Sequence, residues 1–217
     1  MIVLGITGGI GSGKTTAAGY LRSLGFACVD ADQIGRELTA EGSPLLEILD
    51  REFGPDGKYG RGTAILRDSS IEGIKILDRK ALASVVFSDE KARARFDEII
   101  HSRMLRIIRK QIEELRKKEN IRGILLDAPL MYEAGCDTMC DHVILVTAPV
   151  ELRIERVMKR DGSTREDVVR RINSQMSDEE KARLADFVVD NSGDTDELCR
   201  KLDEIIEGLS KLLLERK

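Results

Sequence analysis

A glycine-rich run near the amino terminus has the residue types and the spacing that bind phosphate. It reads Gly8, four residues, then Gly13, Lys14 and Thr15, and it follows the short apolar run of residues 2–7. Glycines let successive backbone amides converge on phosphate oxygens, and the amino end of a following helix adds partial positive charge. A lysine at this spacing reaches the β- and γ-phosphates of a nucleoside triphosphate, and the threonine hydroxyl can bind Mg²⁺. The run therefore predicts a P-loop that binds ATP with Mg²⁺, and not a glycine turn that only joins a strand to a helix. The predicted ATP-binding residues of this loop are Gly8, Gly9, Ile10, Gly11, Ser12, Gly13, Lys14, Thr15 and Thr16.

Carboxylates follow two further apolar runs where strands are expected to end. Asp127 closes the run of residues 124–126, which is the Walker B pattern, and would bind Mg²⁺ directly or through a water molecule. Many buried strands end in aspartate, so this pattern gains its meaning from the P-loop beside it. Asp30 and Asp32 follow the apolar run of residues 26–29. Side chains at that position point into the crevice where open α/β sheets bind ligands.

Three arginines follow the fourth apolar run at helical spacing. Arg153, Arg156 and Arg160 are three and four residues apart, so a helix would place them on one face. Solvated surface charge is the usual reason for such a run, whereas phosphoryl transfer needs mobile cations over the transferred group. Both interpretations stay open, and we favour Arg160 over Arg153 as the arginine that reaches the phosphates.

The histidines and cysteines do not suggest a metal centre. His101 shares a helical stripe with Ile108 and Leu115, so its spacing favours a half-buried packing role. A metal site at Cys136 and Cys140 would need a second Cys or His pair at ligand spacing, and none is near. We therefore predict ordinary reduced thiols.

Composition narrows the partner classes. The 217 residues include 35 basic and 39 acidic side chains, a formal net charge of -4, so no global positive field draws the protein onto nucleic acid. There is no Trp, with three Tyr and five Phe, which leaves little material for base stacking. No apolar run reaches transmembrane length and no leader segment is evident, so we predict a cytoplasmic protein with no nucleic-acid or membrane partner. The absence of an NKxD tetrapeptide, with Ala-Pro-Leu after Asp127, counts against a GTPase.

Five short apolar runs alternate with helical segments, which favours a parallel sheet with right-handed crossovers. Amphipathic helices are expected over residues 14–24, ending at Gly25, over 89–119 and over 196–215. Residues 32–119 are mainly helical and without a strong strand, with a polar, glycine-rich loop at 54–62. The expected strands are residues 2–7, 26–29, 124–126, 143–146 and 187–189.

The predicted fold is α/β: a three-layer P-loop NTPase core with a five-stranded parallel sheet, a helical substrate-binding insertion and a helical lid. The core is expected to contain residues 1–31, 120–148 and 186–217, and the insertion residues 32–119. Residues 149–185 are dense in arginine and too long for a simple crossover, so they form the predicted lid.

The motif set resembles the dephospho-CoA kinase family over nearly the whole chain. The P-loop is shared by many nucleotide enzymes, but DAD followed by Arg36, then the Pro129, Gln175 and Asn191 segments in this order, is far more selective. The matching segments are ITGGIGSGKTT at 6–16, VDADQIGREL at 29–38, LDRKAL at 77–82, DEIIH at 97–101, DAPLMYEAG at 127–135, ERVMKRDG at 155–162, RINSQM at 171–176 and ADFVVDNSG at 185–193.

The resemblance implies transfer of the ATP γ-phosphoryl group to the ribose 3'-hydroxyl of dephospho-CoA with Mg²⁺, on a nucleoside monophosphate kinase-like core. It implies that Asp32 is the general base and that Asp30 positions it, although the two could exchange roles. Arg160 would reach the phosphates from the lid, and Asn191 with Gly193 would border the adenine of ATP. The implied dephospho-CoA cleft contains Asp30, Asp32, Arg36, Arg79, His101 and Glu133.

Two other functions remain open from the sequence. One is a P-loop kinase of another small nucleoside or sugar-like acceptor, and the other is a switch that hydrolyses ATP slowly to change partners. The amphipathic helices are compatible with a monomer or a small homo-oligomer.

Overall fold

The computed structural model describes residues 1–215, with side-chain surroundings defined through residue 211. The chain divides into two compact units, Met1–Asp30 with Arg109–Lys217, and Ala31–Ile108. The division falls within α5 (Glu90–Leu115), whereas the sequence placed the end of the insertion after this helix, at residue 119. The three helices within residues 149–185, the stretch that the sequence predicts to be a lid, belong to the first unit.

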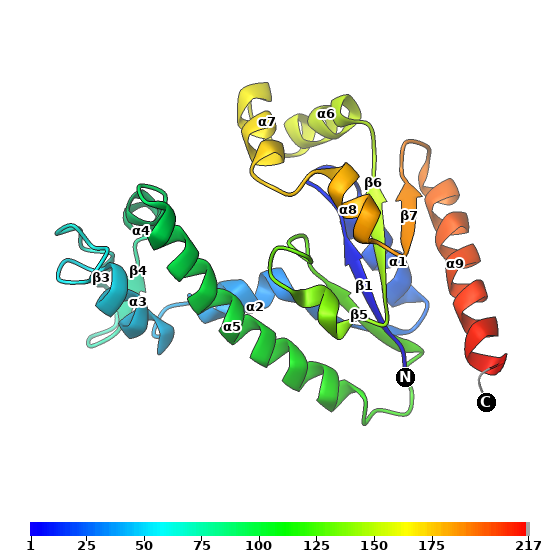
Figure 1. Ribbon diagram of the computed structural model, residues 1–217, viewed down its shortest axis with the longest axis horizontal. Helices are drawn as coiled ribbons and strands as arrows, with labels where there is room; N and C mark the ends of the chain where they lie inside the picture. The colour runs from blue at the N-terminus through cyan, green and yellow to red at the C-terminus, as the bar shows by residue number, and fades with distance from the viewer. Residues whose placement is uncertain (216–217) are drawn as a thin grey trace. The chain divides into compact units, whose positions relative to one another are not determined.

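A five-stranded sheet forms the centre of the first unit (Figure 1). Its strand order is β2-β5-β1-β6-β7, and every neighbouring pair is parallel. The predicted five-stranded parallel sheet and the α/β class are therefore confirmed. The strands are β1 (Val3–Thr7), β2 (Phe26–Asp30), β5 (Gly123–Asp127), β6 (His142–Thr147) and β7 (Phe187–Asp190).

The central strands are apolar on both faces because helices cover the sheet. Helices α1 (Lys14–Ser23) and α9 (Thr195–Glu215) pack together and share one apolar core with β1, β5 and β6. In Figure 1, α9 runs alongside β7. Gly25 (φ 95°) takes the left-handed conformation that turns the chain from α1 into β2, as the sequence predicts.

Three short helices lie between β6 and β7, and each has its own stop or start signal. Helix α6 (Val150–Asp161) ends at the left-handed Gly162, and the Thr164 hydroxyl caps α7 (Arg165–Asn173). A capping box between Ser177 and Glu180 begins α8 (Asp178–Leu184). An apolar cluster on α6 and α7 packs against Ile10 of the P-loop.

The second unit is mainly helical and has its own apolar core. Its helices are α2 (Ala31–Leu38), α3 (Leu45–Phe53), α4 (Arg79–Val86) and the first turns of α5, and they bury Leu49, Phe53 and Ile65. Residues 54–62 form hydrogen-bonded turns, in which Tyr59 stacks on Phe53.

The second unit also contains a small antiparallel pair, β3 (Leu66–Asp68) and β4 (Lys75–Leu77). The sequence predicted no strong strand in residues 32–119, and the structure adds this short pair. Each strand has only three residues, too few for alternation of apolar and polar side chains to stand out from the surrounding sequence.

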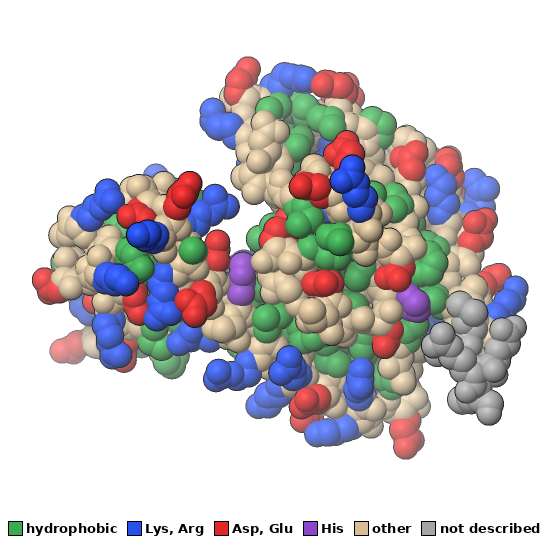
Figure 2. All heavy atoms as spheres, viewed as in Figure 1, with side chains coloured by type: hydrophobic (Ala, Val, Ile, Leu, Met, Phe, Trp, Pro, Cys, Tyr) green, Lys and Arg blue, Asp and Glu red, His purple; other side chains and the backbone are tan. Residues whose placement is uncertain are grey.

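The lengths of the helices and the distribution of charged side chains on the surface bear on the predicted partners. Within residues 1–215, no helix combines the length and the apolar composition that crossing a bilayer requires. Figure 2 shows basic and acidic side chains intermingled over most of the face that it draws. That distribution agrees with the nearly balanced composition of the chain.

Candidate active site

The P-loop connects β1 to α1 and leaves the first turn of the helix uncapped by a side chain. Gly13 is the N-cap of α1, with φ 91°, and contributes no side-chain hydrogen bond to the helix. The first amides of a helix have no partner within the helix, and its dipole places partial positive charge there. Thr15 and Thr16 are exposed in this first turn. The geometry of the loop is that of an anion-binding site.

Lys14 and Asp127, the two residues of the predicted Walker motifs, form an ion pair. The Lys14 Nζ donates to Oδ1 of Asp127, and the two side chains are 15% and 14% exposed. Asp127 ends β5, and strand pairing places it beside Ile6 of β1 and Asp30 of β2. The strand register therefore places the Asp30 and Asp127 carboxylates side by side at the carboxyl end of the sheet, and Lys14 at the start of α1 reaches Asp127 there.

Thr15 and Asp127 are hard oxygen donors of the kind that Mg²⁺ prefers. Within the described part of the chain, no group of three or more His, Cys, Asp or Glu residues could hold a metal ion. Mg²⁺ in kinases is bound by one or two protein oxygens together with phosphate oxygens and waters. A hydroxyl and a carboxylate beside a P-loop fit that mode of binding.

Asn191 holds the P-loop from the end of β7. Its Nδ2 donates to the Ser12 carbonyl at 2.8 Å, and its backbone amide donates to the Thr147 carbonyl at 2.8 Å. A β-carbon at Gly13 would collide with the Asn191 side-chain amide, so close approach as well as positive φ requires glycine there. The sequence expectation placed Asn191 beside adenine, and the structure adds a contact to the loop. Gly193 lies two residues beyond, against Glu197.

The three arginines of α6 differ in how far their side chains are buried. Arg153 is buried and its Nε donates to the Ile10 carbonyl at 2.9 Å. Arg156 is half-buried and donates to the Asn191 carbonyl at 3.0 Å. Arg160 is 60% exposed and paired with its neighbour Asp161 at 2.6 Å. The role of Arg160 at the phosphates stays a prediction, whereas Arg153, the weaker sequence candidate, contacts the loop.

Glu133 links the segment after β5 to the segment before α8. Its Oε1 accepts from the Met176 amide at 3.0 Å and lies 3.5 Å from Nζ of Lys181. Lys181 is fully buried and also donates to the Pro129 carbonyl at 3.1 Å. Sequence analysis did not select Lys181, because nothing in its local pattern distinguishes it from a surface lysine of a short helix.

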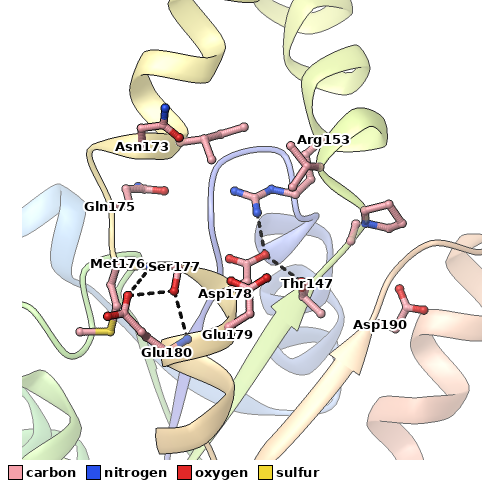
Figure 3. A pocket seen from close by; sticks show the side chains of 14 residues that line it. Thr147, Arg153, Asn173, Gln175, Met176, Ser177, Asp178, Glu179, Glu180 and Asp190 are labelled. Atoms are coloured by element: carbon pink, nitrogen blue, oxygen red, sulfur yellow. Dashed lines mark hydrogen bonds and ion pairs between the residues drawn. The ribbon is translucent and has the colours of Figure 1, made fainter.

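A cavity of about 750 Å³, lined by both polar and apolar side chains, adjoins the P-loop (Figure 3). Arg153 and Gln175 line it and also contact the Ile10 backbone. Thr147, Asp178 and Asp190 line its other sides. Its volume falls within the range of small-molecule sites.

The remaining predicted residues lie in the second unit. Asp32 and Arg36 are exposed on α2, and His101 is half-buried on α5. Arg79 begins α4 and donates to the Thr39 hydroxyl at 3.0 Å. Arg79 and Thr39 border an apolar cavity of about 150 Å³ lined by Leu77, Leu82, Ala83, Val86, Phe87 and Phe96.

All four cysteines are free thiols, and burial is the main cause that raises the pKa of each of them. Burial raises the pKa of Cys136 to about 11 and that of Cys140 to about 12. Burial, together with the negative charge of Asp127, raises the pKa of Cys28 to about 11. Each thiol therefore stays neutral at physiological pH and is a poor nucleophile.

At about pH 8 we expect iodoacetamide to alkylate Cys28, Cys136 and Cys140 much more slowly in the folded protein than after unfolding. A pKa raised by about two units lowers the thiolate fraction about 100-fold, and thiolate is the species that reacts. Peptide mass spectrometry after timed quenching measures each rate separately, with protein in guanidinium as the control. Folded Cys28 that reacts at the unfolded rate would contradict its burial beside Asp127.

Comparisons with known proteins agree over nearly the full length. The family model described as dephospho-CoA kinase matches residues 2–197. The dephospho-CoA kinase of Bacillus licheniformis is 34% identical over 97% of this chain and 98% of its own. That of Corynebacterium diphtheriae is 38% identical over 94% of this chain and 96% of its own.

Solved structures agree with the sequence relatives. A Thermus thermophilus protein has a TM-score of 0.73 and 36% identity, covering 96% of this chain and 97% of its own. Dephospho-CoA kinase from Campylobacter jejuni has a TM-score of 0.66 and 27% identity, with the same coverage of 96% and 97%.

Proposed function

The chain belongs to the dephospho-CoA kinase family, and from that premise we propose that it transfers the ATP γ-phosphoryl group to the ribose 3'-hydroxyl of dephospho-CoA. The products are coenzyme A and ADP. As a member of this family the chain is an ATP-dependent kinase. We further propose which residues of the site bind ATP, which hold Mg²⁺ and which orient the acceptor.

The pairing of Lys14 with Asp127 is the observation that carries the proposal. It places one ammonium group and one carboxylate at the uncapped start of α1. Phosphoryl transfer passes through a loose transition state in which charge spreads over the phosphoryl oxygens, so alignment and charge stabilisation matter more than covalent chemistry. A P-loop with these two groups supplies both, and no phosphoenzyme is required.

The roles of the individual residues follow from this chemistry. Backbone amides of the P-loop bind the phosphates, and Lys14 stabilises charge on the β- and γ-phosphates. Mg²⁺, held by Thr15 and by Asp127 directly or through water, would neutralise phosphate charge. Asp32 orients the acceptor hydroxyl and accepts its proton. Arg160 supplies a further cation from the lid.

The residues proposed to recognise the acceptor are those that the family resemblance implies. Asp30 positions Asp32, and Arg36, Arg79 and His101 bind dephospho-CoA. Glu133 joins this set by the same resemblance, although its contacts to Met176 and Lys181 also give it a bracing role. Asn191 and Gly193 border the adenine of ATP.

An acceptor panel tests the proposal. The protein is incubated with ATP, Mg²⁺ and one acceptor at a time, and ADP formation is followed by a coupled assay. We expect strong acceleration by dephospho-CoA alone, with mass spectrometry of the product identifying coenzyme A. Adenosine, AMP and simple sugars serve as controls. Stronger acceleration by one of these would reassign the acceptor, and ADP formation that no acceptor changes would instead favour a nucleotide switch.

A further inference from the structure

The peptide groups of Ile10, in the middle of the P-loop, are held from both sides by side chains of the lid region. The Nε of Arg153 donates to the Ile10 carbonyl at 2.9 Å, and the Ile10 amide donates to Oε1 of Gln175 at 3.3 Å. Arg153 belongs to α6, and Gln175 lies in the link between α7 and α8. Two segments more than 140 residues away in sequence therefore fix one residue of the loop.

Asp178, the first residue of α8, holds Arg153 in place. Its Oδ2 accepts from NH1 of Arg153 at 2.6 Å and from the Thr147 hydroxyl at 2.8 Å (Figure 3). The Arg153 and Asp178 side chains are 4% and 19% exposed. Hydrogen bonds between charged groups are strong where water is largely excluded. The aspartate therefore fixes the guanidinium, and the guanidinium fixes the loop.

Glycine at position 9 of the loop leaves room for the Arg153 side chain. A β-carbon at Gly9 would collide with the Arg153 guanidinium, so the side chain lies directly against the loop backbone. A guanidinium can bind two partners in one plane, here a carbonyl through Nε and a carboxylate through NH1, whereas an ammonium is a point charge without that fork. The geometry requires arginine specifically.

We propose that Arg153 is a positioning residue for ATP binding: together with Gln175 and Asp178 it holds the P-loop in its phosphate-binding conformation through Ile10. This inference rests on the proposed function of the P-loop. It assigns Arg153 a role in nucleotide affinity without contact to the phosphates. The loop brace formed by Arg153, Gln175 and Asp178 also couples the lid helices to the loop.

Replacement of Arg153 by lysine separates this role from a purely structural one. Lysine retains the charge opposite Asp178, so a structural ion pair would be rescued, but it cannot also hold Ile10 in the same geometry. We expect Arg153→Lys to weaken ADP binding about 10-fold, the size of one lost hydrogen bond to a charged group. The melting temperature should stay close to that of the wild type. In steady state the KM for ATP should rise while kcat and the KM for dephospho-CoA stay unchanged.

Isothermal titration with ADP measures the binding, and two further variants complete the experiment. Gln175→Met removes the acceptor for the Ile10 amide and should weaken ADP binding in the same direction. Arg165→Met is the matched control, because Arg165 pairs with Glu151 at 2.6 Å on the exposed surface of the lid helices and does not contact the loop. It should bind ADP as the wild type does.

Wild-type ADP affinity in Arg153→Lys overturns the proposal. A fall in kcat with unchanged ADP affinity also overturns it, because the residue would then act on the chemical step. Failure of wild-type protein to bind ADP would instead refute the nucleotide site itself, so the two failures are distinguishable.

Discussion

Replacing Lys14 with alanine is expected to lower turnover at least about 100-fold, equivalent to about 2.7 kcal/mol of transition-state stabilisation. The ammonium group sits beside the Asp127 carboxylate at the start of α1, and both side chains are largely buried. Charge that develops on the transferred phosphoryl group is stabilised most by groups already fixed in a site from which water is excluded. Lys14 is the one basic residue of the P-loop sequence at residues 8–16, so alanine removes the positive charge of the loop.

The measurement is steady-state ADP release with dephospho-CoA as the acceptor. Lys117→Ala is the matched control, because Lys117 pairs with Glu114 at 2.8 Å on an exposed surface, with side chains 69% and 59% exposed. That variant should keep wild-type turnover. Circular dichroism and the melting temperature establish that Lys14→Ala is folded. Near wild-type turnover in a folded Lys14→Ala protein would refute the role of Lys14.

The P-loop and the sheet were predictable because their signals are local. Gly8, Gly13 and Lys14 lie within one short motif, and each core strand is a continuous apolar run. These features depend on residues close together in sequence or on the general geometry of parallel sheets. The strand order was not predicted, and the structure adds that β2 pairs with β5, which places Asp30 beside Asp127.

The contacts that hold the loop could not be predicted, because they join distant segments. Asn191 reaches Ser12 across 179 positions, and Arg153 reaches Ile10 across 143. Helical spacing placed Arg153 and Arg160 on one face of α6 but could not say which end of that face is buried. Burial is set by neighbours such as Asp178, and no local pattern pairs that residue with Arg153.

The burial of a charged side chain could not be predicted from the sequence either, because it also depends on distant segments. Lys181 reads as a surface residue in a helix of seven residues, yet it is fully buried between Glu133 and the Pro129 carbonyl. A buried lysine is stable only where fixed acceptors compensate for lost hydration. Those acceptors come from the segment after β5, so the three-dimensional fold had to be known before the lysine could be recognised.

Replacing Asp32 with asparagine is expected to lower kcat at least about 100-fold, the low end of the contribution of a positioned general base. ATP affinity should remain close to that of the wild type, because Asp32 is predicted to contact the acceptor hydroxyl and not the nucleotide. Asparagine has nearly the same shape and stays compatible with the first turn of α2, where Asp32 is exposed. The substitution therefore removes the negative charge and the capacity to accept a proton while it leaves the backbone intact.

Two measurements on the same protein separate the acceptor from the nucleotide: turnover with dephospho-CoA, and ATP binding by titration. Glu37→Gln is the matched control, since Glu37 is an exposed carboxylate of the same helix that accepts from Gln33 at 2.8 Å. It should leave both quantities at wild-type values. A larger loss in Asp30→Asn than in Asp32→Asn would exchange the roles of the two aspartates. An Asp32→Asn protein that loses ATP binding but keeps its turnover would contradict the assignment of Asp32 to the acceptor, because the carboxylate would then act on the nucleotide.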